Sequence, residues 1–274
     1  LYDTRRDVEI TWPKKDDTVL YKPHLPEEYS RIAKAAGVTG VVVVEASLRL
    51  EDNRWVLDLV EDDPFYVGLV GNIDPSRKDF AEPLAVLKKD SRFVGIRSRS
   101  RTPIDYESER VLENLRTLAA QDLTLDYLCN GQGIPGIEKI DAVARKIPEL
   151  RIVVNHALGY DFNGGPPPAD WSAAVKRLAE NKNVYCKVSG LYQRCVEQPA
   201  KQDIRHYGPV LEVLWREFGA NRLVYGSNWP CTKKSGSYAS FVKLVDAFFA
   251  GKGQQARERY YWKNAAEAYR LELE

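Results

Sequence analysis

Seven short apolar runs, each followed by an amphipathic segment, constrain the fold of this chain more than any other feature. The runs recur at intervals of about 25 to 40 residues and are rich in valine, leucine and isoleucine, as strands buried on both faces of a sheet are. Strands that alternate with helices in this way predict a parallel sheet built from βα units. The strands that we expect cover residues 41–45, 65–71, 93–97, 123–128, 151–155, 184–188 and 223–225.

The segments between these runs carry apolar residues at helical spacing. The helices that we expect cover residues 27–36, 110–121, 171–181, 210–218, 238–250 and 256–269. Seven βα units are one fewer than a closed (β/α)8 barrel contains, and the polar stretch 1–26 has no strand of its own. The sequence therefore predicts an α/β fold, a single (β/α)8 TIM-barrel domain over residues 1–274 whose first strand lies upstream of Leu1. A doubly wound sheet of seven strands is the alternative, although no glycine-rich dinucleotide loop favours it.

The charge balance of the chain gives no support to large anionic partners and is compatible with most small ligands. Forty lysines and arginines nearly match 39 aspartates and glutamates, so a net charge of +1 offers no electrostatic reason to bind nucleic acid or an anionic membrane. No apolar run approaches the roughly 20 residues that a membrane span needs, and no segment has the layout of a signal peptide. We expect a cytoplasmic protein with a small-molecule partner, and the sequence leaves a homo-oligomer open.

The four cysteines lie far apart in the sequence and show no CxxC spacing. This spacing argues against a zinc knuckle and against a disulfide framework, so Cys129, Cys186, Cys195 and Cys231 are expected to be reduced thiols.

Polar residues directly follow each predicted strand, and in a barrel those positions form the mouth where catalysis takes place. Together they would provide one imidazole, several cations for an anionic or polyhydroxylated ligand, and neutral hydrogen-bonding groups. The residues are Glu45, Ser47, Asn72, Asp74, Arg97, Arg99, Arg101, Tyr127, Asn130, Asn155, His156, Lys187, Ser189, Tyr192, Ser227, Asn228 and Trp229.

His156 is the most informative member of this set. It follows the apolar run 152–154, and a neutral imidazole there would suit either the polarisation of a carbonyl or the ligation of a metal. The other two histidines, His24 and His206, have no second ligand at a metal-binding spacing, and we expect both at the surface. A metal site built from the printed residues alone would lack the clustered ligands that zinc requires.

The cations of the set each leave two interpretations open. Arg97, Arg99 and Arg101 occupy alternate positions after a strand, which suits recognition of a carboxylate but is also typical of a solvated charge run. Lys187 lies inside a strand, where an unpaired ammonium group would be costly. It is therefore expected either to point into the mouth or to form an ion pair within the barrel.

Several ordered motifs resemble the amidohydrolase-related family of TIM-barrel hydrolases, in particular its branch of lactonases that act on sugar lactones and on pyrone dicarboxylate. The resemblance covers essentially the whole chain. The motifs are Leu1-Tyr-Asp3, GVTGVVVVEA at 37–46, VGLVG at 67–71, FVGIR at 93–97, Asn155-His156, NVYCKVSG at 183–190, RLVYGSNWP at 222–230 and NAAEAY at 264–269.

The resemblance implies roles for individual residues. His156 matches the family's sixth-strand histidine and Arg97 its fourth-strand arginine, which contacts a substrate carboxylate in the pyrone branch. A His-x-His pair is expected just upstream of Leu1. Two alternatives stay open: this pair and His156 hold one divalent metal such as zinc, or the site works without a metal. From their positions near the strand ends, and not from the resemblance, further substrate contacts are expected from Arg99, Tyr127, Lys187, Ser189 and Trp229.

Asn228 is where the sequence departs from the family, because the family has an aspartate there that activates the hydrolytic water. An amide cannot accept a proton at neutral pH, so the change removes a general base worth roughly 10²- to 10⁴-fold in rate. We expect a hydrolase of a lactone or similar cyclic ester, with His156 and Asn228 as catalytic residues. The alternatives are a metal-dependent decarboxylase of the same family and a barrel that binds a small molecule without turnover.

Overall fold

The computed structural model describes residues 1–98, 103–129 and 131–272. Three of the predicted strand-end residues, Arg99, Arg101 and Asn130, lie outside these ranges.

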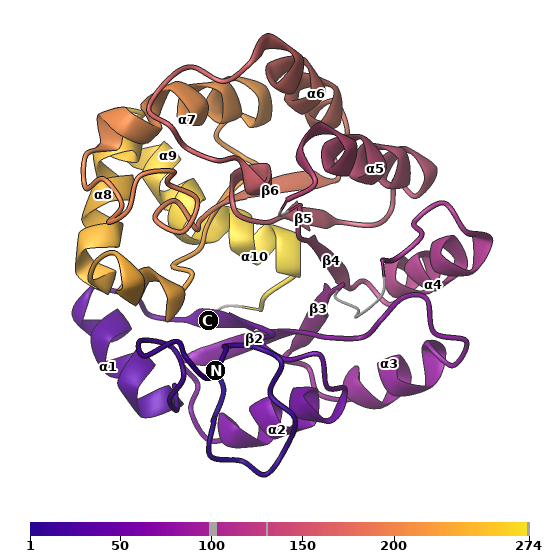
Figure 1. Ribbon diagram of the computed structural model, residues 1–274. Helices are drawn as coiled ribbons and strands as arrows, with labels where there is room; N and C mark the ends of the chain where they lie inside the picture. The colour runs from indigo at the N-terminus through magenta and orange to yellow at the C-terminus, as the bar shows by residue number, and fades with distance from the viewer. Residues whose placement is uncertain (99–102, 130, 273–274) are drawn as a thin grey trace.

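Seven parallel strands form one curled sheet in sequence order, as predicted (Figure 1). Every predicted run contains a strand, and the runs 93–97, 184–188 and 223–225 have the predicted bounds. This arrangement confirms the barrel-type α/β fold and excludes the strand order of a doubly wound sheet. The strands are β1 Val41–Val44, β2 Tyr66–Gly71, β3 Phe93–Arg97, β4 Thr124–Tyr127, β5 Ile152–Val154, β6 Val184–Val188 and β7 Leu223–Tyr225.

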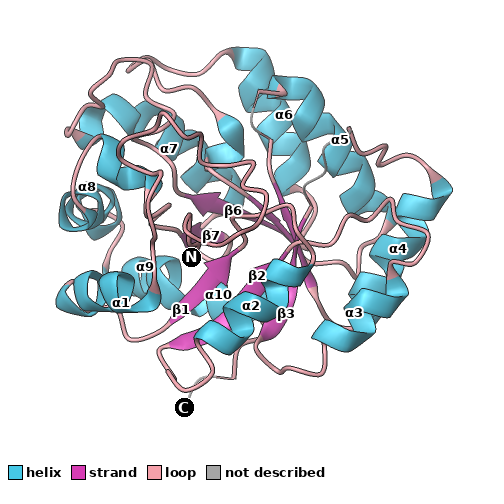
Figure 2. Ribbon diagram, turned by 60° about the horizontal axis from the view of Figure 1, so that its bottom comes forward, coloured by secondary structure: helices cyan, strands magenta, loops and turns pink. Residues whose placement is uncertain are grey.

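Helices cover the outer face of the sheet (Figure 2). They pack through apolar stripes: in α4, residues Val111, Leu112, Leu115 and Leu118 are buried at helical spacing. Within the described residues, none of the helices is long and apolar enough to span a bilayer. The helices are α1 Pro26–Ala35, α2 Glu51–Leu59, α3 Ala81–Leu87, α4 Glu109–Ala120, α5 Gly133–Lys146, α6 Ala169–Ala179, α7 Ile204–Phe218, α8 Tyr238–Ala250, α9 Gln254–Glu258 and α10 Asn264–Tyr269.

Two of the predicted helices differ from their predicted extents by more than two residues. The prediction started α7 at residue 210, after Pro209, but the helix begins at Ile204 and includes this proline. The side chain of Asp203 caps it by accepting a hydrogen bond from the backbone N–H of Arg205 at 2.9 Å. The predicted helix 256–269 is instead α9 and α10 joined by a π-helical turn, Arg259–Lys263, which carries the fully buried Tyr260.

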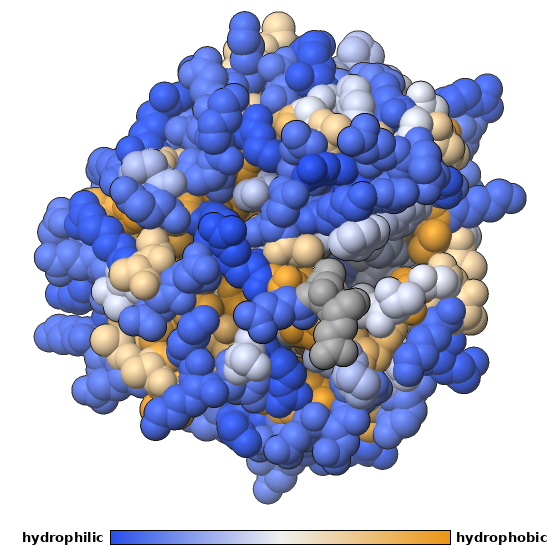
Figure 3. All heavy atoms as spheres, turned by 180° about the vertical axis from the view of Figure 1, so that it is seen from behind, coloured by the Kyte–Doolittle hydropathy of each residue, from blue (hydrophilic) through white to orange (hydrophobic). Residues whose placement is uncertain are grey.

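Helix α10 closes one end of the curled sheet. Inside the sheet, Val70, Val94 and Val153 form a small core with Ala268 and Tyr269 of this helix. Figure 1 shows α10 in yellow in the middle of the ring of helices. The face of the molecule that lies behind the view of Figure 1 is mostly hydrophilic, and apolar residues are visible near its centre (Figure 3).

The sheet is open between its two edge strands as far as the described residues go, since β1 pairs with β2 and β7 with β6. A cavity of about 1660 Å³ follows this opening and is lined by both edge strands. The first strand and the His-x-His pair inferred from the family resemblance stay predictions.

A buried layer of charged side chains lies inside the sheet, beyond the core that Tyr269 helps to form. Asp126 of β4 is fully buried and accepts hydrogen bonds from the Nζ of Lys187 at 2.6 Å, the Nδ2 of Asn155 at 2.9 Å and the hydroxyl of Tyr269 at 2.9 Å. The Oδ1 of Asn155 also accepts a hydrogen bond from the Nη1 of Arg97 at 3.5 Å. These contacts connect strands β3, β4, β5 and β6 with helix α10.

We predict that Lys187→Met lowers the free energy of unfolding by about 3–5 kcal/mol, because it leaves the Asp126 carboxylate buried without a countercharge. Adding Asp126→Asn should recover at least half of this loss, since an uncharged amide needs no cation and still accepts from Tyr269. Urea denaturation of the two variants measures the effect. Strictly additive losses in the double variant would contradict the pairing.

Candidate active site

His156 and Asn228 follow β5 and β7, and both line the cavity that opens between β7 and β1. The sequence placed both residues at the barrel mouth, and the structure brings them to the same cavity. Ser189, Trp229, Arg97 and Lys187 also line it.

The backbone that carries His156 is unusual. His156, Ala157 and Leu158 all have left-handed conformations, with φ of 53°, 49° and 57°. Such backbone costs on the order of 1–3 kcal/mol per residue and persists only where its surroundings hold it. The guanidinium group of Arg194 donates to the carbonyl oxygen of Gly159, at the end of this turn.

The imidazole of His156 is packed against the loop that follows β6. Its Nδ1 lies 2.9 Å from the Oγ of Ser189. Gly190 has a φ of +67°, and a Cβ added there would lie 2.8 Å from the same Nδ1. The close approach of the ring therefore requires glycine at position 190.

Burial, together with the charges of Arg97, Lys187 and Arg194, lowers the pKa of His156 to about 3. The imidazole is therefore neutral at pH 7. A neutral imidazole can accept a hydrogen bond at one nitrogen and donate one at the other.

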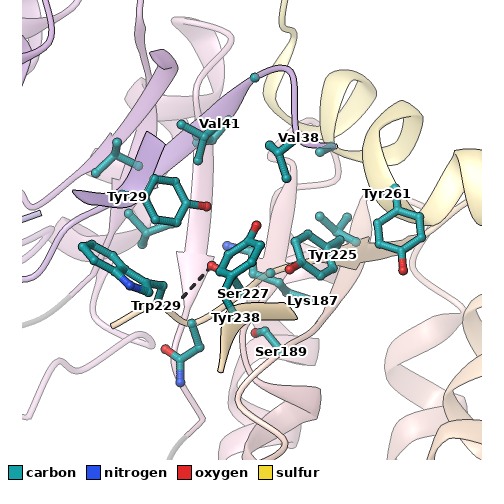
Figure 4. A pocket seen from close by; sticks show the side chains of 18 of the residues that line it. Tyr29, Val38, Val41, Lys187, Ser189, Tyr225, Ser227, Trp229, Tyr238 and Tyr261 are labelled. Atoms are coloured by element: carbon teal, nitrogen blue, oxygen red, sulfur yellow. Dashed lines mark hydrogen bonds between the residues drawn. The ribbon is translucent and has the colours of Figure 1, made fainter. Parts of the chain in front are cut away.

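Asn228 also has left-handed backbone, with φ of 51°, a conformation that asparagine adopts more readily than most residues. Its Nδ2 donates to the Oε1 of Gln193 at 2.9 Å. The next residue, Trp229, donates its backbone N–H to the Oγ of Ser227 at 3.2 Å (Figure 4). Figure 4 also shows Tyr29 and Tyr238 beside these residues on the cavity wall.

The prediction that His24 lies at the surface is wrong, because its side chain is fully buried. The backbone of His24 pairs with that of Tyr2, and its ring lies between Tyr2 and Trp229, with centroids 5.2 and 5.1 Å away. Its Nδ1 is 3.0 Å from the Oε2 of Glu28. No periodic pattern marks this segment, so its burial could not be read from the sequence.

His206 is only partly buried, and it is not among the residues that line the cavity. Its Nε2 lies 3.3 Å from the carbonyl oxygen of Phe162 and 3.4 Å from the Sγ of Cys195. All four cysteines are free thiols, as predicted.

The cations around His156 have carboxylate partners. Arg97 donates from Nε to the Oε1 of Glu45 at 2.7 Å and from Nη2 to the Glu45 carbonyl oxygen at 2.5 Å. Lys187 forms the ion pair within the barrel that the sequence left open, and Arg194 is 2.6 Å from Asp161. The positive charge of these three side chains is therefore locally balanced.

Tyr127, predicted to contact substrate, is buried away from the cavity lining. Its ring packs edge-on against Tyr106, and its hydroxyl donates to the Oε1 of Gln132 at 3.3 Å.

The described residues do not fit a divalent metal. They contain no group of three or more histidine, cysteine, aspartate or glutamate side chains arranged to hold one. The side chains whose charges act on His156 are cationic, and Asn228 contributes a neutral amide. Zinc instead takes nitrogen, sulfur and carboxylate ligands in a tetrahedral set.

Three residues that organise the site were not singled out from the sequence: Asp126, Gln193 and Arg194. Asp126 carried a usable signal, because it is a lone carboxylate within an otherwise apolar strand and needs a buried partner. Gln193 and Arg194 lie in a loop without periodicity, and only the fold reveals what they contact.

Comparison with known proteins agrees with the fold. The pattern of the amidohydrolase family matches residues 3–271. An L-fucono-1,5-lactonase from Burkholderia ambifaria is 30% identical over 271 residues, which cover 95% of this chain and 90% of that one.

Two solved structures share the fold. An amidohydrolase from Burkholderia multivorans with bound HEPES superposes with a TM-score of 0.83 at 23% identity, covering 93% of this chain and 91% of that one. A probable 2-pyrone-4,6-dicarboxylic acid hydrolase from Acinetobacter baumannii, with citric acid bound, gives a TM-score of 0.75 at 17% identity and covers 93% of each chain.

The lowered pKa of His156 predicts a specific dependence of stability on pH. Between pH 6.5 and about 3, the unfolded chain protonates this imidazole and the folded chain does not, so stability falls as pH falls. Replacing His156 with asparagine, which tolerates the left-handed backbone, removes this linkage. Between pH 7.5 and 5, wild-type protein should therefore lose about 2 kcal/mol more than His156→Asn in urea denaturation. Equal losses would show that His156 titrates normally in the folded protein.

Proposed function

Because the chain belongs to the amidohydrolase family, we propose that it is a hydrolase that opens the ring of a neutral sugar lactone. The observation that carries this proposal is the neutral imidazole of His156 at the barrel mouth, on the same cavity as the amide of Asn228. The likeness to an L-fucono-1,5-lactonase over nearly the whole chain supports the substrate class.

The contact between Ser189 and His156 is compatible with the tautomer that the reaction needs. When the hydroxyl of Ser189 donates to Nδ1 of His156, the imidazole proton lies on Nε2 and is available to the lactone carbonyl oxygen. Hydrogen bonds to this oxygen become stronger as negative charge develops on it. A neutral imidazole performs this role without competing for a proton at pH 7.

Asn228 orients the water. Its Nδ2 is held by Gln193, so its Oδ1 is the atom left to accept a hydrogen bond from water in the cavity. The water oxygen bonds to the carbonyl carbon, the bond from that carbon to the ring oxygen breaks, and one water proton is transferred to the ring oxygen. The product is the open-chain hydroxy acid.

Among the described residues, the charge balance of the mouth favours a neutral lactone over a dicarboxylate. Arg97 was expected to bind a substrate carboxylate, but two of its donor groups are already engaged by Glu45. Lys187 and Arg194 are paired as well. A doubly charged substrate would have to break these pairs or go without a partner.

The two alternatives from the sequence remain to be tested. A metal-dependent decarboxylase would need metal ligands beyond those that the described residues provide, such as the predicted His-x-His pair. A barrel that binds without turnover would also have the geometry described above, and the assay below separates it from a hydrolase.

We predict that the protein hydrolyses L-fucono-1,5-lactone, monitored as acid release in a pH-stat at pH 7, and does not hydrolyse 2-pyrone-4,6-dicarboxylate at a comparable kcat/KM. His156→Asn should lower kcat by about 10²- to 10³-fold, the effect of removing one donor to the developing oxyanion. Circular dichroism serves as the folding control. Binding of the lactone without acid release above the buffer rate would establish the silent barrel instead.

A further inference from the structure

We propose that Gln193 is a further catalytic residue, whose Nε2 donates a hydrogen bond to the carbonyl oxygen of the bound lactone. This inference rests on the proposed function and adds a second donor to the one supplied by His156.

The loop after β6 places Gln193 between the two catalytic strand ends. Because β6 lies between β5 and β7 in the sheet, its loop runs between His156 and Asn228. Ser189, at the start of the loop, contacts His156, and Gln193, four residues later, holds Asn228. His156 and Asn228, which both have left-handed backbone, are therefore held by this one loop.

The loop itself is rigidly anchored. The backbone N–H of Arg194 donates to the carbonyl oxygen of Gly190 at 3.0 Å. Tyr192 is fully buried, and its hydroxyl donates to the Oε1 of Gln202 at 2.6 Å. The side chain of Gln193 therefore projects from a fixed turn into the cavity that it lines.

The hydrogen bonds of the Gln193 amide leave its donor unused. Its Oε1 accepts from Asn228, while its Nε2 is buried and has no partner among the described residues. A buried N–H group without a partner is unfavourable unless a ligand or water supplies an acceptor. The carbonyl oxygen of a lactone is such an acceptor.

The other glutamines of this loop do not share this property. The Nε2 of Gln198 donates to the carbonyl oxygens of Tyr192 and Cys195 at 3.0 and 2.8 Å. The Nε2 of Gln202 donates to the carbonyl oxygen of Ser235 at 2.8 Å. These two amides stabilise the loop, whereas Gln193 lines the cavity and its Nε2 has no acceptor among the described residues.

The test compares Gln193→Met with the matched control Gln198→Met, using steady-state hydrolysis of L-fucono-1,5-lactone. Gln193→Met should lower kcat by about 10²-fold or more and change KM less than threefold, as expected for a donor that acts mainly in the transition state. Gln198→Met should lower the melting temperature while its kcat stays within threefold of wild type.

A double variant separates substrate contact from the positioning of Asn228. If Gln193 only orients Asn228, then Gln193→Met should cost nothing further in an Asn228→Ala background. The proposal requires a further loss of at least tenfold in kcat in that background. If wild type turns over the lactone but the double variant shows no further loss, the role of Gln193 is overturned and the proposed function stands. The same conclusion follows if the kcat of Gln193→Met is unchanged. Absence of turnover by wild type overturns the proposed function and this role with it.

Discussion

The buried carboxylate of Asp126 is the constraint on which the interior of this barrel depends. A charge removed from water must be matched by an opposite charge and by hydrogen bonds to its remaining lone pairs. Lys187, Asn155 and Tyr269 meet that requirement from two strand ends and the C-terminal helix. The contacts fix the helix that closes one end of the curled sheet and the two strands, β5 and β6, after which His156 and Ser189 lie.

The same pairing determines the electrostatics of the candidate site. Burial, together with the charges of Arg97, Lys187 and Arg194, keeps His156 neutral. Each of these three cations is matched by a carboxylate, so the described part of the mouth carries cations without a strong net field. A site of this kind stabilises a transition state through oriented hydrogen bonds from neutral groups. Asn228, at the position where the resembled family has an aspartate, fits this chemistry, because a nearby carboxylate would favour protonation of the imidazole.

The sequence predicted the parts of this account that depend on short-range patterns. Valine-rich runs marked the strands, and their polar ends correctly placed His156 and Asn228 on one cavity. The burial of His24, the start of α7 before Pro209 and the contacts of Gln193 depend on segments that meet only in the folded chain. For Lys187, the sequence posed the right alternatives, and the position of Asp126 on a neighbouring strand decided between them.

The most direct test of a hydrolytic site built from neutral donors is a crystal structure of the protein with the hydroxy acid formed from L-fucono-1,5-lactone. The account predicts that one carboxylate oxygen of this product lies within hydrogen-bonding distance of both the Nε2 of His156 and the Nε2 of Gln193. It also predicts that Arg97 keeps its contacts with Glu45. A product carboxylate bound instead to Arg97, with the Glu45 pair broken, would contradict the account.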